Sequence, residues 1–341
     1  MKKQPILSVL MPCYNAADTL PETLESLACQ SLAGFEIVAV DDGSTDATPE
    51  ILAAWSEQEL PLRVISQAHG GIVEALNAGL NACSGAYIAR MDADDLCHPD
   101  RLSRQLSFLQ AHPEFAVLGC QVEAFPEGQV REGFRLYLEW QNSLTSDADI
   151  RREMFVESPL AHPSAVFRKD WVTSLGGYQE HGWAEDYDLW LRLYLAGGRF
   201  AKLPEVLLHW RERPERLTRT HSRYSLENFL RAKAHYLLPG PLAGREAVMI
   251  WGAGMVGRRL SKHLLREGAP LVAFIDIDPG KIGKTRRGLP IIPPEALPEW
   301  WQRYQSPVLL AAVGARGARA LIRRRLAGMG LVEGQDWWGA A

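Results

Sequence analysis

The sequence predicts an α/β protein with two domains, on the strength of three observations. Short β-rich segments alternate with helical segments over the first 120 residues, and a similar alternation starts again after residue 245. The chain of 341 residues is also longer than the roughly 100–200 residues of a usual domain. Strands separated by single helices form βαβ units, which build a mainly parallel sheet covered on both faces.

The elements expected in the first 120 residues follow one another in regular order. Apolar runs predict strands at Ile6–Met11, Phe35–Val40, Leu62–Ser66, Ala86–Met91 and Ala116–Cys120. Amphipathic segments between them predict helices at Ala17–Gln30, Thr48–Glu57, Ile72–Ala82 and Pro99–Ala111. Ligands of such sheets bind beyond the carboxyl ends of the strands, so the loops that follow the strands are where a site is expected.

The middle of the chain is less regular. Its expected elements are a helix around Trp140–Phe155, a strand at Ser164–Arg168, a helix at Ala184–Ala196 and a long charged helix over residues 209–236. Residues 237–244 contain two prolines and two glycines, which favours a linker. The expected division is therefore a first domain over residues 1–236, a linker over 237–244 and a second domain over 245–341.

The second domain repeats the alternation on a smaller scale. Its expected strands are Val248–Trp251, Leu271–Asp276 and Val308–Val313, and its expected helices are Met255–Glu267 and Arg316–Gly328. Gly252, Gly254 and Gly257 lie between the first strand and its helix, and Asp276 follows Gly257 by nineteen residues. A glycine turn lets the backbone approach a phosphate, and an acid at this distance binds ribose. This pattern resembles Rossmann-like domains, particularly those that bind sugar nucleotides, and predicts a nucleotide in this domain.

Other interpretations of the second domain stay open. The 97 residues from 245 have room for only half of a doubly wound fold, and they show no hydride-transfer residues. A structural or oligomerising role and the use of NAD are the alternatives to nucleotide binding. The arginines within Arg316–Arg325 form either a solvated helix face or a patch for phosphates or an anionic membrane surface.

Composition excludes several classes of protein. The net charge is −4, without the basic excess of a nucleic-acid-binding protein. This net charge is the sum of two unequal parts. Residues 1–244 have a net charge of −11, and residues 245–341 have a net charge of +7. The five cysteines are odd in number and scattered, as in reduced cytosolic proteins. No segment reaches the ~18 apolar residues of a membrane span. We expect a cytoplasmic protein that at most contacts a membrane from that side.

Acidic residues follow two of the expected strands. Residues 41–46 contain three aspartates after the second strand, and residues 92–95 contain three more after the fourth. The carboxyl ends of parallel strands share one edge, so five or six carboxylates are expected to converge there and to repel one another without a cation. Mg²⁺ or Mn²⁺ prefers such oxygen ligands and often bridges them to a diphosphate. The alternative for residues 41–46 is a turn that caps the next helix.

Several segments in this order resemble the successive motifs of family 2 glycosyltransferases with the GT-A fold. The likeness extends over about residues 5–215. Its segments are residues 8–15 (SVLMPCYN), 40–46 (VDDGSTD), 77–80 (NAGL), 89–95 (ARMDADD), 99–102 (PDRL), 162–164 (HPS), 175–178 (LGGY) and 184–190 (AEDYDLW). The resemblance implies a GT-A fold in the first domain, followed by the small Rossmann-like domain.

The resemblance also implies roles in binding the donor. Pro12, Tyr14 and Asp42 would line the pocket for the nucleotide base. Asp92 would lie near the ribose or a metal-bound water, and Asp94 would bind Mn²⁺ or Mg²⁺. The metal would neutralise charge on the departing nucleoside diphosphate.

On the acceptor side, the resemblance makes Asp186 the catalytic base. It would take the proton of an acceptor hydroxyl in a single displacement with inversion. Without the resemblance, Glu185 and Asp186 are equally explained as acidic residues that favour a helix N-terminus. His162 and Glu185 are candidates for the acceptor site. Arg211, where the family often carries an Arg-x-His element, is a candidate for a phosphate contact.

Together these features predict a metal-dependent inverting glycosyltransferase that transfers a single sugar of the hexosyl type. The donor is a nucleotide-diphosphate sugar, with a UDP-sugar favoured, and the acceptor is a glycan, a lipid-linked sugar or a small molecule in cell-surface glycan or glycolipid synthesis. The QxxRW motif of processive synthases is absent. The alternatives are a non-catalytic sugar-nucleotide sensor and an NAD(P)-dependent enzyme that uses the second domain. No nucleic-acid partner is expected.

Overall fold

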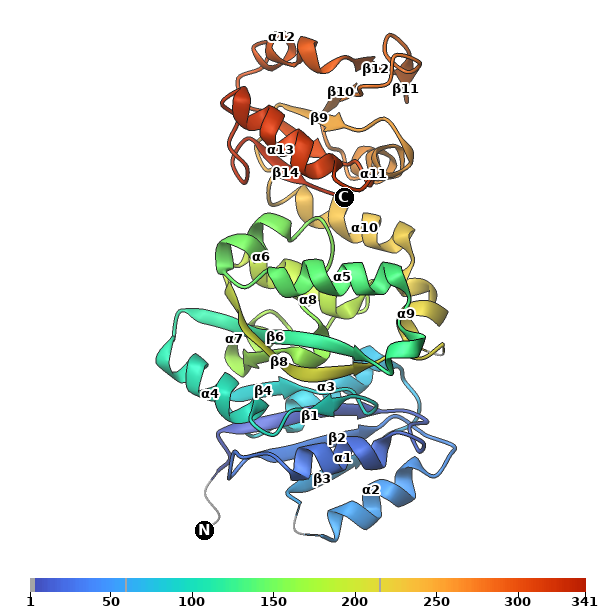
Figure 1. Cartoon of the computed structure of the whole chain (residues 1–341), viewed down its shortest axis with the longest axis vertical. Helices are drawn as coiled ribbons and strands as arrows, with labels where there is room; N and C mark the ends of the chain where they lie inside the picture. The colour runs from blue at the N-terminus through green and yellow to red at the C-terminus, as the bar shows by residue number, and fades with distance from the viewer. Residues whose placement is uncertain (1–3, 59, 215) are drawn as a thin grey trace. The chain divides into compact units, whose positions relative to one another are not determined.

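The computed structural model describes residues 4–58, 60–214 and 216–341 (Figure 1). These residues form two compact units. The first consists of Met1–Ile150, Pro159–His181 and Glu185–Thr220. The second consists of Arg151–Ser158, Gly182–Ala184 and His221–Ala341. Residues 221–236 therefore group with the second unit, and the expected domain limits at residues 236 and 245 stay a prediction.

A mixed sheet lies at the centre of the first unit, and eight of the described strands form it. Its order is β3-β2-β1-β4-β7-β6-β8-β5. The strands are β1 (Leu7–Cys13), β2 (Glu36–Asp41), β3 (Leu62–Ser66), β4 (Tyr87–Arg90), β5 (Leu96–Cys97), β6 (Phe115–Phe125), β7 (Val166–Arg168) and β8 (Arg199–Arg211). β3, β2, β1 and β4 are parallel, which confirms the predicted βαβ array. The other half is mixed, because β7 is antiparallel to β4 and β6, and β5 to β8.

Helices cover both faces of this sheet. The helices between and after its strands are α1 (Leu20–Ala28), α2 (Thr48–Ser56), α3 (Ile72–Ala82), α4 (Arg101–Ala111), α5 (Glu132–Ser143), α6 (Asp147–Glu153), α7 (Lys169–Ser174), α8 (Glu185–Leu195) and α9 (Leu217–Thr220). Leu24 of α1 belongs to the same buried cluster as Val9 of β1. The neighbouring Leu10 faces the opposite side, where Gly79 lets α3 approach so closely that a Cβ there would lie 2.2 Å from Leu10 Cδ1.

Local sequence explains where α2 begins. Asp46 Oδ1 accepts a hydrogen bond of 3.0 Å from the N–H of Thr48, the first residue of the helix. Pro49 follows in the first turn, where its missing N–H costs nothing. Asp46, which precedes the N-cap residue Ala47, therefore forms a turn just before the helix, in line with the alternative interpretation of residues 41–46.

The direction of β7 brings a distant segment to the edge where β4 ends. Val166, the first residue of β7, pairs with Ala89 near the end of β4. The short 3-10 turn η2 (His162–Ser164) comes just before β7. It therefore lies at the edge from which residues 91–95 leave β4, although seventy residues of chain separate the two.

Two expected helices differ from the structure. The helix expected over residues 209–236 is wrong at its start, because β8 continues to Arg211, which pairs with Phe125 of β6. Only Leu226–Leu237 forms a long helix there, α10. The helix expected around Trp140–Phe155 is split into α5 and α6, because Ser146 Oγ accepts the N–H of Asp149 at 3.2 Å and starts a new helix.

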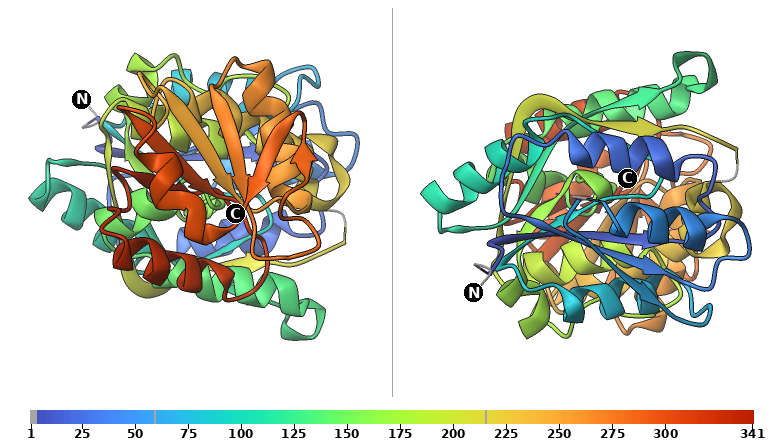
Figure 2. Two further views of the ribbon diagram at one scale, coloured as in Figure 1. Left: turned by 90° about the horizontal axis from the view of Figure 1, so that it is seen from above. Right: turned by 90° about the horizontal axis from the view of Figure 1, so that it is seen from below.

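The second unit contains a smaller sheet of order β11-β12-β10-β9-β13-β14 (Figure 2, left). Its elements are β9 (Ala247–Trp251), α11 (Met255–Arg266), β10 (Leu271–Ile275), β11 (Thr285–Arg286), β12 (Leu289–Ile292), α12 (Leu297–Trp301), β13 (Pro307–Ala311), α13 (Ala318–Gly328) and β14 (Trp337–Gly339). All strand pairs are parallel except the hairpin of β11 and β12. Met249, Ile275, Leu309 and Trp337 lie in its buried core. Across the described helices of the chain, none is long and apolar enough to cross a membrane.

Candidate active site

Loops from four strands meet at one edge of the first sheet. β1 pairs in parallel with β2 on one side and with β4 on the other. Tyr14, Asp42 and Asp92 follow these three strands, so their loops leave the sheet side by side, as the sequence predicts. His162 reaches the same edge from the start of β7.

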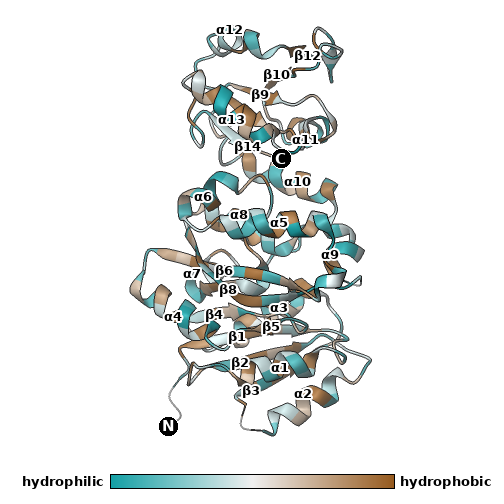
Figure 3. Cartoon of the chain, in the orientation of Figure 1, coloured by the Kyte–Doolittle hydropathy of each residue, from teal (hydrophilic) through white to brown (hydrophobic). Residues whose placement is uncertain are grey.

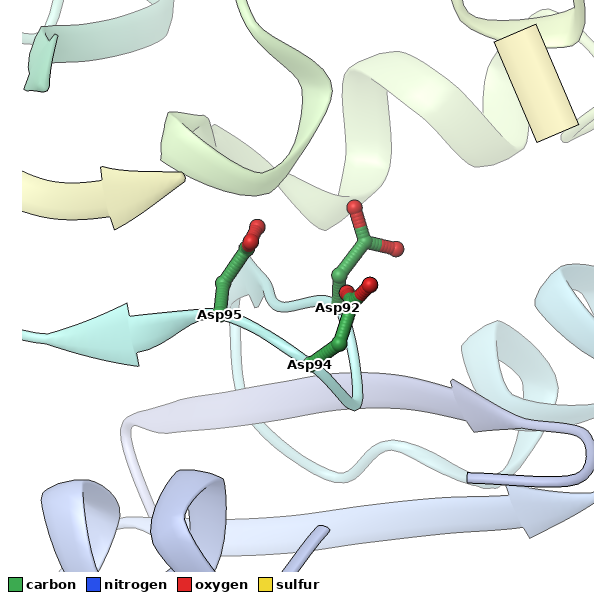
Figure 4. Close-up of side chains that lie close together, drawn as sticks. All are labelled: Asp92, Asp94 and Asp95. Carbon is green, nitrogen blue, oxygen red and sulfur yellow. The ribbon is translucent and has the colours of Figure 1, made fainter. Parts of the chain in front are cut away.

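Three carboxylates gather after β4. Asp92, Asp94 and Asp95 each offer an oxygen, and these atoms lie within 4.8 Å of one another. Their side chains point to the same side of the loop (Figure 4). Burial, followed by the charge of Asp92, raises the pKa of Asp94. Burial, followed by the charges of Asp94 and Asp92, raises the pKa of Asp95 well above its usual range.

The three carboxylates suit a hard divalent cation. Asp95 is fully buried, and its Oδ2 atom has no hydrogen-bond partner among the described residues. A buried acceptor without a donor is costly unless a cation takes that place. An all-oxygen donor set fits Mg²⁺ or Mn²⁺. Of the five or six carboxylates expected to converge, only these three form a possible cation group among the described residues. Asp41 accepts the N–H of Ser44, and Asp46 accepts the N–H groups of Thr48 and of Ala17 in the loop after β1.

Two arginines from the end of β8 hold the carboxylate loop. Arg213 Nε lies 3.1 Å from Asp94 Oδ2. Arg211 donates from Nε to the carbonyl of Asp94 at 2.6 Å and from its backbone N–H to Asp95 Oδ1 at 2.8 Å. Its guanidinium also pairs with Glu22 at 2.5 Å. Arg211 thus fixes the loop backbone, Arg213 contacts the carboxylate itself, and a phosphate contact by Arg211 stays a prediction.

Arg90 lies within the motif of residues 89–95, but the sequence predicted no role for it. It ends β4, is 3% exposed, and its Nη1 lies 2.6 Å from Asp92 Oδ1. Its positive charge also acts on Glu185, Asp186 and His162. The signal available in the sequence was a single arginine between an apolar strand and the acidic motif.

Asp186 lies in the first turn of α8, beside the buried Glu185. Burial, followed by the negative charge of Glu185, raises the pKa of Asp186 to about 7. A carboxylate with such a pKa can accept a proton at neutral pH, as a general base must. The helix-start interpretation and the base interpretation are therefore compatible.

His162 is buried, with 5% of its surface exposed. Its Nε2 atom lies 2.9 Å from the hydroxyl of Tyr178. Burial, followed by the positive charge of Arg90, lowers the pKa of His162 well below its usual range. The imidazole is therefore neutral at physiological pH and acts through hydrogen bonding. Its contact with an acceptor stays a prediction.

The expected base pocket has an exposed ring and a buried acid. Tyr14 is 48% exposed, whereas Pro12 is buried in β1. Asp42 is 3% exposed, and its carboxylate accepts hydrogen bonds from the N–H groups of Gly70 and Gly71 at 2.9 and 2.8 Å. It therefore holds the loop between β3 and α3. A direct contact of Asp42 with a base stays a prediction.

In the second unit, the predicted glycines allow close backbone contacts. Gly252 has φ +118°, and a Cβ there would lie 2.7 Å from the carbonyl oxygen of Ala312. A Cβ at Gly257 would lie 1.8 Å from the carbonyl oxygen of Gly252, so only glycine lets α11 pack on this turn. Gly254 is the N-cap residue of α11. Gly252 and Gly257 thus allow the close packing of strand, turn and helix, and nucleotide binding by this turn stays a prediction.

Asp276 follows β10, as predicted, but its carboxylate is already bound. Oδ2 accepts the N–H of Ala253 at 2.9 Å, and Oδ1 accepts the N–H of Asp278 at 3.0 Å. Lys281 Nζ lies 3.2 Å from Oδ2. Burial acts to raise the pKa of Asp276, but these hydrogen bonds outweigh it and lower the pKa. A ribose contact of Asp276 stays a prediction.

The basic helix α13 carries both hydrophilic and hydrophobic residues (Figure 3). Arg319 and Arg323 both pair with the buried Glu153, at 2.6 and 2.8 Å. Arg325 pairs with Glu295. Much of the positive charge expected to face a membrane is therefore neutralised within the second unit.

Comparison with known proteins agrees with this geometry. Residues 8–176 match the model of the family described as glycosyl transferase family 2. The chain is also 39% identical over 206 residues to the amylovoran biosynthesis glycosyltransferase AmsE of Erwinia amylovora, which covers 60% of this chain and 75% of that protein. The chain belongs to glycosyl transferase family 2. The part matched by the family model includes Asp42, Asp92 and Asp94, and Asp186 lies beyond it.

Solved structures of glycosyltransferases share the fold. S. aureus TarS 1-349 in complex with UDP-GlcNAc aligns with a TM-score of 0.55 and 21% identity, over 76% of this chain and 72% of that chain. The mannosyltransferase PcManGT from Pyrobaculum calidifontis, in complex with GDP-Man and Mn²⁺, aligns with a TM-score of 0.50 and 23% identity, over 69% and 63%. The first unit of this family 2 glycosyltransferase thus has the GT-A fold that its motifs predicted.

Proposed function

We propose that this glycosyltransferase is metal-dependent and inverting, and that it moves one hexosyl unit at a time. The donor is a nucleotide-diphosphate sugar, with a UDP-sugar favoured, and the acceptor is a hydroxyl. The observation that carries the proposal is a candidate base, Asp186, with a pKa of about 7, near Arg90, which pairs with Asp92 of the carboxylate cluster.

Asp94, with Asp92 and Asp95, would hold Mn²⁺ or Mg²⁺. When bound, the ion supplies positive charge beside the departing diphosphate. Arg213 keeps the Asp94 carboxylate oriented, and Arg90 does the same for Asp92. The neighbour PcManGT, whose structure contains GDP-Man and Mn²⁺, supports this assignment of the metal.

Asp186 would remove the proton of the acceptor hydroxyl while the acceptor oxygen attacks the anomeric carbon opposite the diphosphate. One displacement inverts the configuration at that carbon. Glu185 raises the pKa of the base, and neutral His162 with Tyr178 offers hydrogen bonds to acceptor hydroxyls. Arg211 is the proposed phosphate contact, and Pro12, Tyr14 and Asp42 are the proposed base pocket.

The acceptor is proposed to be a glycan, a lipid-linked sugar or a small molecule in cell-surface glycan or glycolipid synthesis. The relative named for amylovoran biosynthesis supports a role in glycan biosynthesis. The five cysteines, none of which forms a disulfide, support a cytoplasmic reaction. Association with the cytoplasmic face of a membrane is part of the proposal.

A second function is proposed for the second unit: a Rossmann-like module that binds a nucleotide or sugar nucleotide without redox chemistry. The close packing of the turn at Gly252 and Gly257, with Gly254 at the N-cap of α11, supports it. Binding of UDP-sugars to a variant whose first site is inactivated, Asp94→Ala, would test it. An absence of binding to that variant would contradict it.

The main proposal is tested by hydrolysis of UDP-, GDP- and dTDP-sugars with Mn²⁺ and after chelation. We expect turnover that needs the metal and that is lost in Asp94→Ala. Asp100→Ala is the matched control, because Asp100 is a partly exposed acid outside the cluster, at the N-cap of α4. Metal-independent turnover, or full activity of Asp94→Ala, would contradict the proposal.

A further inference from the structure

The loops after β1, β2 and β3 are tied into one rigid surface. Asn15 Oδ1 accepts the N–H of Thr45 at 2.9 Å, which joins the first loop to the second. Gly43 has φ +73°, and a Cβ there would lie 2.7 Å from the backbone nitrogen of His69, so the second loop touches the third. A side chain on any of these loops therefore has a fixed position relative to the others.

Two aromatic side chains stand on this surface. The rings of Tyr14 and His69 are stacked, with centroids 4.2 Å apart and an interplanar angle of 24°. The side chain of His69 is 53% exposed, and Tyr14 is 48% exposed. Stacked, half-exposed rings are a typical surface for a planar base.

Asp42 contacts His69 of this pair, and both of its carboxylate oxygens already accept hydrogen bonds. Besides Gly70 and Gly71, Gln67 Nε2 donates to its Oδ1 at 2.7 Å. His69 Nδ1 lies 3.0 Å from Asp42 Oδ2 and 3.1 Å from the carbonyl oxygen of Asp42. The carboxylate thus has a partner on each side before a nucleotide arrives.

The partners of His69 fix its tautomer. Both atoms that face Nδ1 are oxygens that can only accept, so Nδ1 carries the hydrogen. In the neutral ring, Nε2 is then an acceptor. Nε2 points away from Asp42, and the part of the chain that the structure describes gives it no hydrogen-bond partner.

We propose that His69, oriented by Asp42, recognises the imide N–H of the donor's base. Uracil, thymine and guanine present such an N–H, whereas cytosine presents an acceptor at the corresponding position. Asp42 is then a positioning residue that acts through His69. This inference rests on the proposed function, because it concerns the donor of the same site.

The experiment is a calorimetric titration of the full chain with UDP and with CDP in the presence of Mn²⁺. The wild type should bind UDP about three- to tenfold more tightly than CDP, the contribution of one hydrogen bond. His69→Phe keeps a ring against Tyr14 but has no acceptor, so it should bind both nucleotides equally. Asp42→Asn should lose the same preference and raise the donor KM.

The matched control is His112→Phe. His112 packs against Phe108 with ring centroids 4.5 Å apart and an interplanar angle of 34°. Its side chain is 47% exposed and lies beside Glu114, so an aromatic ring and a carboxylate flank it as they flank His69. This variant should keep the wild-type ratio of the two affinities.

The outcomes separate this inference from the proposed function. If His69→Phe still prefers UDP while binding stays metal-dependent, the role of His69 is overturned and the proposed donor class stands. If the wild type binds neither nucleotide, the preference for a UDP-sugar fails, and the inference fails with it, whereas the wider donor class is decided by the hydrolysis of GDP- and dTDP-sugars.

Discussion

Each unit places acids at the carboxyl edge of a parallel array, but the two edges differ in how the charges are compensated. In the first unit, Asp92, Asp94 and Asp95 lie within 4.8 Å of one another, and the pKa of Asp95 is raised well above its usual range. In the second, Asp276 is bound by two backbone N–H groups and Lys281, and its pKa is lowered.

The difference bears on the cation site proposed for the first edge. A cluster of carboxylates close enough to repel one another destabilises the fold unless it is neutralised. Arg90 and Arg213 neutralise part of this charge, and the proposed cation would neutralise the rest. A single carboxylate saturated by its own backbone stabilises a turn instead. The Asp276 carboxylate is therefore compensated within the second unit, whereas the raised pKa values of Asp94 and Asp95 indicate that the carboxylates of the first edge are only partly compensated.

The largest expected effect is on catalysis at the first edge. Asp186→Asn removes the candidate base, so kcat should fall by about 10²–10⁴-fold, the usual contribution of general base catalysis. Donor binding should be retained, because the carboxylate cluster is intact. The measurement is transfer kinetics beside titration with UDP. Asp170→Asn, an exposed acid in the first turn of α7, should behave as wild type. Full activity of Asp186→Asn would contradict the proposed mechanism.

The next effect is the pH dependence of that same group. Because the pKa of Asp186 is raised to about 7, the base is protonated below this value, and kcat should fall as the pH is lowered. Well below the pKa, the fall should be about tenfold per pH unit. Glu185→Gln removes the negative charge that helps to raise the pKa, so the acid limb should move to lower pH. An unchanged pH profile in this variant would show that Glu185 does not act on the base.

The sequence predicted the local part of the first site. The acids follow strands that the apolar pattern identifies, and parallel neighbours place Asp42 and Asp92 at one edge. Arg90 and Arg213 were missed because their partners depend on long-range pairing. The charge of Arg90 acts on His162 because β7 returns antiparallel to β4 and brings the preceding turn to this edge. Arg213 reaches Asp94 because β8 pairs with β5, next to the carboxylate loop.

For the second site, the sequence predicted the position of Asp276 but not its partners. Its partners include the backbone N–H groups of Ala253 and Asp278, which any residue type supplies. Likewise, the arginine run of α13 was open to several interpretations, because Glu153 and Glu295 come from distant segments. A sequence shows which side chains are charged more readily than it shows which partners neutralise them in the fold.

A smaller effect is expected on stability: an Asp→Asn substitution should stabilise the first edge and destabilise the second. Asp95→Asn removes one charge from the repelling cluster, so the metal-free protein should have a higher Tm in EDTA. Because the pKa values of Asp94 and Asp95 are raised, the wild type should lose stability as the pH rises through them. The variant should also lose most of the rise in Tm that Mn²⁺ gives the wild type. A lower Tm of Asp95→Asn in EDTA would show that the cluster is compensated within the protein.

The corresponding change in the second unit, Asp276→Asn, should have the opposite sign. It exchanges an acceptor for an amide N–H that faces the donor of Ala253, which should lower the local stability by about 1–3 kcal/mol. The pKa of Asp276 is lowered, so its contribution is present above the ordinary pKa of aspartate and is lost as the pH falls through the lowered value. Hydrogen exchange should accelerate in β9 and β10 and stay unchanged in β1. Asp278→Asn, at a half-exposed carboxylate beside the same lysine, is the control. Equal exchange in both variants would show that the Asp276 carboxylate is not needed by the turn, and would favour its predicted role in binding ribose.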